Sequence, residues 1–332
     1  MHLKLLFKRG ALLAAANWPA VAIQFAAEIT FQMLLAVPVV GAAVIVAVLL
    51  GGDLADLLAG SLREIIATLA TTLVSQPFAF VAFSTAFIVV LLGGSILTFL
   101  VKGGIVDVMI AAETTSGPVE REPMTFETFR HGLRFTLDRF MNGCRRLHRR
   151  YVELGFWLIG VYVVSGALYL AFVLYGYRVI SDRLLVIEWT FVAAVAALVL
   201  VAWITVVNLF YLLTQIAIAV DDVSVRDGVA EAIRFVRADV RELAGVLGVV
   251  VVMIIGAQIA SALSLSGVGL IAFIPLVGLA VFPLQIAALL IRGLVFEYLG
   301  LTALGAYLAL YLAHRQRRPL ARKAPMGQLV TP

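Results

Sequence analysis

Long runs of apolar residues constrain this chain more than any other feature. A helix needs about 20 apolar residues to cross the hydrocarbon core of a membrane. Six stretches are long enough: 19–50, 78–101, 155–175, 189–220, 244–264 and 279–313. The runs are continuous and do not alternate with polar residues, which favours helices over a β-barrel. The sequence therefore predicts an all-α fold, a polytopic transmembrane helix bundle of six spans.

Composition supports the same interpretation. The chain is 63% hydrophobic and 14% charged, whereas a soluble domain carries about 25% charged residues. Too few charges remain to cover a water-facing surface, so lipid must cover much of it. We expect one transmembrane helical domain over 1–313 and a basic tail over 314–332. Pro19 suits a first helical turn, so residues 3–16 are expected to form a short interfacial helix before the first span.

The lysines and arginines predict how the chain threads the membrane. Counted over alternate segments between the spans, 21 of them fall on one side and three on the other. Because cytoplasmic segments carry the excess of positive charge, both termini are expected in the cytoplasm. The stretch 265–313 stays open: Pro275, Gly278 and Pro283 interrupt it. It could form one span, a re-entrant segment with a span, or two spans.

Two amphipathic segments share a core one hundred positions apart, FRHGLRF at 129–135 and VAEAIRF at 229–235. The first is predicted to be an interfacial helix over 125–151, because its apolar residues recur at steps of three and four. Basic residues beside an aromatic stripe suit anionic headgroups. We expect membrane lipids, and not nucleic acid, to contact the arginines of this segment: Arg130, Arg134, Arg145, Arg146, Arg149 and Arg150.

The second amphipathic segment is predicted to be a helix over 224–243. Ser224 and Asp227 form a capping box that marks its start. Its four arginines are balanced by four acids, so we expect it to pack on protein, with an arginine–acid contact to the first segment. Both segments lie on one side of the membrane, which disfavours an inverted repeat. A third amphipathic helix is expected over 53–74, on the opposite surface.

Polar residues inside the spans suggest a second kind of site. Asn17, Gln24, Glu28 and Gln32 recur at steps of seven, four and four, so they share one face of the first span. Such a face is costly in lipid and should point into the bundle. Arg292 and Glu297 in the last span complete this candidate polar site. We expect Glu28 and Arg292 to approach each other, as a structural ion pair or as part of a proton or substrate pathway.

No catalytic, cofactor-binding or metal-ligating set is expected. The four histidines lack metal-binding spacing, and the single cysteine, Cys144, excludes an internal disulfide. The acids Asp221, Asp222 and Asp227 at the end of the fourth span could bind Mg²⁺ in an intramembrane lipid-modifying enzyme. Helix capping explains the same acids without a metal.

The order of features resembles a group of uncharacterised bacterial six-span membrane proteins, which includes the membrane domain attached to some glycerophosphodiester phosphodiesterases. The residues that carry the resemblance are Asn17-Trp18-Pro19, Pro38, Asp221-Asp222, Ser224 with the AIRFVR run, and the aromatic, basic end from Tyr311 to Arg318. No phosphodiesterase domain is present. The resemblance implies the fold, a bacterial inner membrane and an accessory role.

These observations favour a non-enzymatic accessory or scaffold protein that binds lipid or a membrane-protein partner. A transporter or permease subunit that uses the polar face around Glu28 is the first alternative. An intramembrane lipid-modifying enzyme is the second. The sequence identifies neither a substrate nor an oligomeric state.

Overall fold

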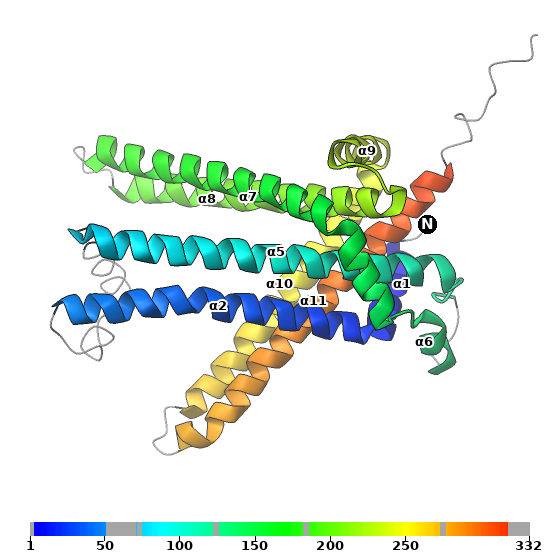
Figure 1. The fold of residues 1–332 in the computed structure, drawn as a ribbon, viewed down its shortest axis with the longest axis horizontal. Helices are drawn as coiled ribbons and strands as arrows, with labels where there is room; N and C mark the ends of the chain where they lie inside the picture. The colour runs from blue at the N-terminus through cyan, green and yellow to red at the C-terminus, as the bar shows by residue number, and fades with distance from the viewer. Residues whose placement is uncertain are drawn as a thin grey trace, which may run out of the picture. The chain divides into compact units, whose positions relative to one another are not determined.

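The computed structural model describes residues 3–50, 71, 75–121, 126–181, 186–272 and 277–317. In this part of the chain every regular element is a helix (Figure 1), which confirms the all-α prediction. The helices are α1 (Leu3–Ala16), α2 (Trp18–Leu50), α5 (Pro77–Thr115), α6 (Phe126–Gly132), α7 (Leu137–Ser181), α8 (Val186–Asp221), α9 (Val225–Ala238), α10 (Val240–Ala272) and α11 (Val277–Arg317).

Six of these helices, α2, α5, α7, α8, α10 and α11, are long and apolar enough to cross a membrane. They correspond to the six predicted spans, but most extend further at one or both ends. α11 is one helix with Pro283 inside it, and it continues through His314 and Arg315 to Arg317. The first four residues of the predicted tail are therefore helical. The predicted interfacial segment 53–74 falls, except for Thr71, outside the described residues.

The chain divides into two compact units, which we describe separately. Unit 1 comprises Met1–Ala22 with Gly103–Pro332, and unit 2 comprises Ile23–Lys102. The prediction of one domain over 1–313 stays a prediction. In unit 2, the Phe31 ring of α2 lies directly on α5 at Gly94, where a Cβ atom would come within 2.0 Å of the ring. Only glycine allows this close approach of the ring to the helix backbone.

Two helical hairpins dominate unit 1. α7 lies beside α8, and α10 lies beside α11 (Figure 1). Polar side chains join the first pair: the Tyr162 hydroxyl donates to Asn208, and Trp203 Nε1 donates to Ser165 Oγ at 3.0 Å. Such bonds satisfy polar groups that lipid would leave without partners.

Most buried side chains of unit 1 gather at one end of its long helices. We call this end the polar layer and define it as α1, α6 and α9 with residues 103–121, 137–154, 211–224 and 301–317. Within the most apolar stretch of each of the six long helices, at most 17% of the residues are buried. The buried core of unit 1 therefore lies in the polar layer, where the charged residues are. Its fully buried members include Leu13, Met109, Leu147, Ile216, Phe235 and Leu308.

The helix predicted over residues 3–16 is confirmed as α1, and it is packed into this core. Its position at a membrane interface stays a prediction. Leu13 and Ala14 are fully buried, and α1 packs closely on α11. Two glycines allow the approach: a Cβ on Gly10 would lie 2.4 Å from the Thr302 carbonyl oxygen, and one on Gly305 would lie 2.9 Å from the Gly10 Cα.

Both predicted amphipathic helices are interrupted. The segment 125–151 breaks at 133–136, because the N–H groups of Arg134 and Phe135 each donate to Asn17 Oδ1 at 2.9 Å. Those two N–H groups therefore do not bond to carbonyls one turn earlier, as a helix requires. The segment 224–243 breaks at Asp239, which ends α9 and precedes α10.

The predicted start of α9 is confirmed. Ser224 is the N-cap, and its Oγ accepts a hydrogen bond from the Asp227 N–H at 3.3 Å. Just before it, Asp222 has φ +52°, a left-handed conformation that aspartate tolerates better than most residues. This turn ends α8 at Asp221 and redirects the chain into α9, which runs across the ends of α7 and α8 (Figure 1).

Candidate functional site

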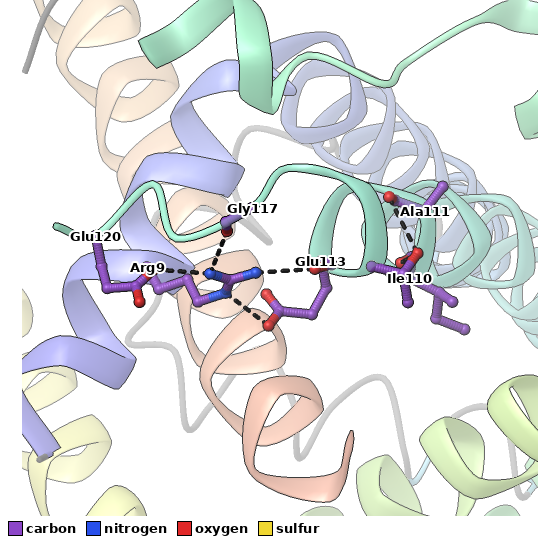
Figure 2. A network of polar contacts seen from close by, with 7 residues as sticks. Arg9, Ile110, Ala111, Glu113, Gly117 and Glu120 are labelled. Carbon is purple, nitrogen blue, oxygen red and sulfur yellow. Dashed lines mark hydrogen bonds and ion pairs between the residues drawn. The ribbon is translucent and has the colours of Figure 1, made fainter. Parts of the chain in front are cut away.

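A buried cluster of charges around Arg9 joins α1 to the end of α5 (Figure 2). Arg9 Nε lies 2.6 Å from Glu113 Oε1, and Arg9 Nη1 lies 2.7 Å from Glu120 Oε2. Burial lowers the pKa of Arg9, but attraction to Glu113 and hydrogen bonds to both carboxylates outweigh it and raise the pKa above its ordinary value. The guanidinium therefore stays charged.

The same guanidinium also caps the C-terminal end of α5. Arg9 donates to the carbonyl oxygens of Glu113 at 2.8 Å and Gly117 at 2.6 Å. The last carbonyls of a helix lack partners within the helix, and a cation beside them is favourable. Gly117 has φ +65°, the left-handed conformation that commonly terminates a helix. Sequence reasoning missed this cluster because Arg9 and Glu113 are 104 residues apart.

Asn17 connects a second pair of segments in the polar layer. Its side chain is fully buried. The Nδ2 group donates to the carbonyl oxygens of Leu13 and Gly132, both at 2.9 Å, and Oδ1 accepts from Arg134 and Phe135. Two donors and two acceptor positions are all that an asparagine side chain offers. Asn17 is therefore fully occupied in holding the loop between α6 and α7.

Two aspartates tie the end of α11 to the rest of the polar layer. Asp221 accepts from the Tyr311 hydroxyl and lies 3.1 Å from Arg315. Asp239 binds His314 Nδ1 at 2.5 Å and Arg317 at 3.3 Å. Phe235 packs edge-on against the Tyr311 ring at a centroid distance of 5.2 Å. The aromatic and basic residues from Tyr311 to Arg317 are thus a folded part of the layer.

These contacts bear on the metal-site alternative. Asp221 and Asp222 bind cationic or hydroxyl groups of the protein: Asp222 lies 2.6 Å from Arg150 of α7. Among the described residues, no group of three His, Cys, Asp or Glu side chains could hold a metal ion. The hydrogen bonds of Asp227 cap α9, as the capping interpretation expects.

The six candidate lipid-contact arginines separate into two groups. Three bind protein: Arg134 donates to Thr115 Oγ1 at 2.6 Å, Arg146 lies 2.6 Å from Asp107, and Arg150 binds Asp222. The other three, Arg130, Arg145 and Arg149, are exposed. Of the residues that the structure describes, none forms an ion pair or hydrogen bond with the side chain of Arg145 or Arg149. These two arginines are free to meet a partner outside the chain.

The predicted contact between the two amphipathic segments takes a different form. Arg150 of the first segment reaches Asp222, which lies two residues before the second segment begins. Inside the second segment, Glu231 binds Arg234 and Asp239 binds the end of α11. The acid in this contact, Asp222, belongs to the linker between α8 and α9 and not to the second segment.

A cavity of about 420 Å³ lies between α7, α8 and α9. Its walls are mainly apolar and include Trp157, Val161 and Phe210. Two charged residues, Glu153 and Arg226, also line it. A largely apolar site with a few polar groups is typical of small-molecule binding.

The candidate polar site in the spans is distributed over both units. In unit 1, Arg292 Nη2 donates to Gln258 Oε1 at 3.1 Å and lies over the Phe296 ring at 5.7 Å. Arg292 also lines a cavity of about 350 Å³ between α10 and α11. Glu297 lies half-buried on the same helix.

In unit 2, Gln32 Nε2 donates to Glu28 Oε1 at 3.1 Å, and Gln32 is exposed. That this face of α2 points into the bundle stays a prediction. Gln24 is half-buried one turn before Glu28. Because Glu28 and Arg292 belong to different units, their approach to each other stays a prediction.

The six long apolar helices make this chain a multi-pass α-helical membrane protein. Comparisons with family models, with curated proteins and with solved structures found no match.

Proposed function

We propose that this protein is a non-enzymatic accessory protein of a bacterial inner membrane, which binds anionic lipid headgroups through Arg145 and Arg149. In this proposal the polar layer lies at the cytoplasmic surface and both termini are cytoplasmic. The excess of positive charge on that side supports the orientation. The resemblance to bacterial six-span proteins supports the location and the accessory role.

The observation that carries the proposal is a row of exposed residues on α7. Leu137, Met141, Arg145 and Arg149 follow one another at steps of four, so they lie along one side of the helix. Leu137 is 65% exposed and Met141 is 41% exposed. Apolar side chains beside free cations suit the boundary between acyl chains and headgroups, where the cation reaches the phosphate.

The expected strength of this binding follows from the charges. A cation close to an anionic membrane surface contributes about 1 kcal/mol. Two arginines should therefore contribute about 2 kcal/mol, or roughly 30-fold in affinity.

The test replaces both arginines, Arg145→Gln with Arg149→Gln. Purified protein is placed in nanodiscs of mixed phosphatidylglycerol and phosphatidylcholine, and the lipid retained after extraction is measured by mass spectrometry. We expect retention of phosphatidylglycerol to fall by about tenfold or more.

The matched control is Arg237→Gln with Arg241→Gln, which removes the same charge from exposed positions on α9 and α10. The segment 224–243 that carries them is neutral overall, with four arginines and four acids. The control should change retention less than twofold. Equal losses in the two pairs, or none in either, would contradict the proposal.

A further inference from the structure

The cavity between α7, α8 and α9 lies beside the row of exposed arginines but differs from it in charge. Glu153 lies on α7 and Arg226 lies in the first turn of α9, and both line the cavity. Both residues are exposed. Neither residue, within the described part of the chain, forms a hydrogen bond or an ion pair through its side chain. The cavity thus offers one free positive and one free negative group.

The walls of the same cavity are apolar along two helices. Trp157 and Val161 lie at steps of four from Glu153 on α7, and Val207 and Phe210 face the cavity from α8. The cavity volume of about 420 Å³ falls within the range of roughly 300–1,000 Å³ that is typical of ligand sites. A ligand with an apolar chain along α7 and α8 and a polar group at Glu153 and Arg226 would contact all of these surfaces.

The two free charges restrict the class of ligand. A purely anionic headgroup would satisfy Arg226 but would be repelled by Glu153. A headgroup with a phosphate and an ammonium group satisfies both, because charge-assisted hydrogen bonds to each are strong and directional. A primary ammonium can also donate hydrogen bonds to a carboxylate, which a quaternary ammonium cannot.

We propose that this cavity binds one phospholipid with a zwitterionic, primary-amine headgroup, with its phosphate at Arg226, its ammonium at Glu153 and an acyl chain against Trp157 and Phe210. The inference rests on the proposed function, since it assigns a second lipid class to the same protein. It predicts that the chain distinguishes lipids by headgroup, with anionic lipid on α7 and zwitterionic lipid in the cavity.

The experiment uses full-length protein, purified in detergent and depleted of lipid. Phosphatidylethanolamine, phosphatidylglycerol and phosphatidylcholine are added singly at matched concentrations, and bound lipids are counted by native mass spectrometry. We expect one phosphatidylethanolamine to bind wild-type protein at least about fivefold more tightly than phosphatidylcholine, because only the primary amine bonds to Glu153.

Variants separate the roles of the two charges. Arg226→Gln should weaken binding of phosphatidylethanolamine by about tenfold, since it removes a charge-assisted hydrogen bond to the phosphate. Glu153→Gln should reduce the preference for phosphatidylethanolamine over phosphatidylcholine by about fivefold and leave phosphatidylglycerol binding undiminished. Both side chains are exposed, so these variants are expected to fold.

A second pair of variants tests the cavity itself. Val207→Phe adds bulk to the cavity wall and should abolish tight phosphatidylethanolamine binding. Val206→Phe makes the same change at the neighbouring position, which is 53% exposed and does not line the cavity. It should bind phosphatidylethanolamine as wild type does. If Val207→Phe does not fold, as judged by gel filtration, the two charge variants decide the question.

Unchanged phosphatidylethanolamine binding in Arg226→Gln and Glu153→Gln would overturn the inference. Equal binding of all three lipids to the wild type would overturn it as well. The proposed function is tested separately, by phosphatidylglycerol retention in the Arg145→Gln, Arg149→Gln protein. This double variant should leave the phosphatidylethanolamine site intact.

Discussion

Replacement of Gly10 with valine is expected to unfold the polar layer or to destabilise it severely. A Cβ atom at position 10 would lie 2.4 Å from the Thr302 carbonyl oxygen and 3.1 Å from the Ala306 nitrogen. Both are backbone atoms of α11, so no side-chain rotation relieves the clash. Overpacking a well-packed core costs about 1–3 kcal/mol, and a backbone clash at a helix crossing should reach the upper end or exceed it.

The measurement is the Tm of detergent-purified protein, followed by the loss of monodisperse protein on heating. Gly10→Val should lower the Tm by roughly 5–10 °C if the protein accumulates at all. Gly300→Ala on α11 is the matched control, because nothing lies within 4 Å of a Cβ there. It should leave the Tm unchanged or raise it slightly, since alanine favours a helix. A normal Tm for Gly10→Val would show that α1 does not pack on α11 as described.

Replacement of Arg9 with methionine is expected to cost about 3–5 kcal/mol in the free energy of unfolding, because it leaves buried carboxylates without their cation. Arg9 is only 8% exposed, and the side chains of Glu113 and Glu120 are 8% and 7% exposed. The end of α5 also loses the two carbonyl contacts that Arg9 provides.

Two comparisons make this second prediction specific. Lys4→Met removes the same charge from an exposed position on α1, and it should change stability by less than about 0.5 kcal/mol. The triple variant Arg9→Met, Glu113→Gln, Glu120→Gln removes the carboxylate charges together with the cation. It should regain at least half of the lost Tm, since the penalty comes from uncompensated charge. A triple variant no more stable than Arg9→Met alone would contradict this explanation.

The helices that cross the membrane could be predicted from the sequence because lipid leaves few choices. A segment in hydrocarbon must satisfy its backbone within a helix and must be apolar over its length. Runs such as 189–220 meet both requirements locally, and α8 covers that run. The N-cap of α9 could be predicted for a similar reason, since Ser224 and Asp227 interact within one turn.

The polar layer could not be predicted in the same way, because its determinants are distant in the sequence. The segment 125–151 has helical periodicity throughout, yet Asn17 takes its N–H groups at 134 and 135 and breaks the helix. No local pattern signals that bond. Likewise, the requirement for glycine at Gly10 and Gly305 follows only from the packing of α1 on α11.

For the same reason, the sequence alone could not separate the protein-bound arginines of α7 from the free ones at the candidate site. Sequence periodicity treats Arg145, Arg146, Arg149 and Arg150 alike as basic residues of an amphipathic helix. In the fold, Arg146 faces an acid on α5 and Arg150 faces an acid in the linker after α8, at 2.6 Å each. Only the tertiary structure shows that Arg145 and Arg149 point away from the protein.

The most direct test of lipid binding at these two residues is photo-crosslinking with a phosphatidylglycerol that carries a reactive group on its headgroup. The labelled lipid is reconstituted with wild-type protein, and the crosslinked peptides are identified by mass spectrometry. We expect the label to concentrate on residues 137–149 and to fall by about tenfold in the Arg145→Gln, Arg149→Gln protein. Label spread evenly over all exposed segments, or unchanged in that variant, would contradict it.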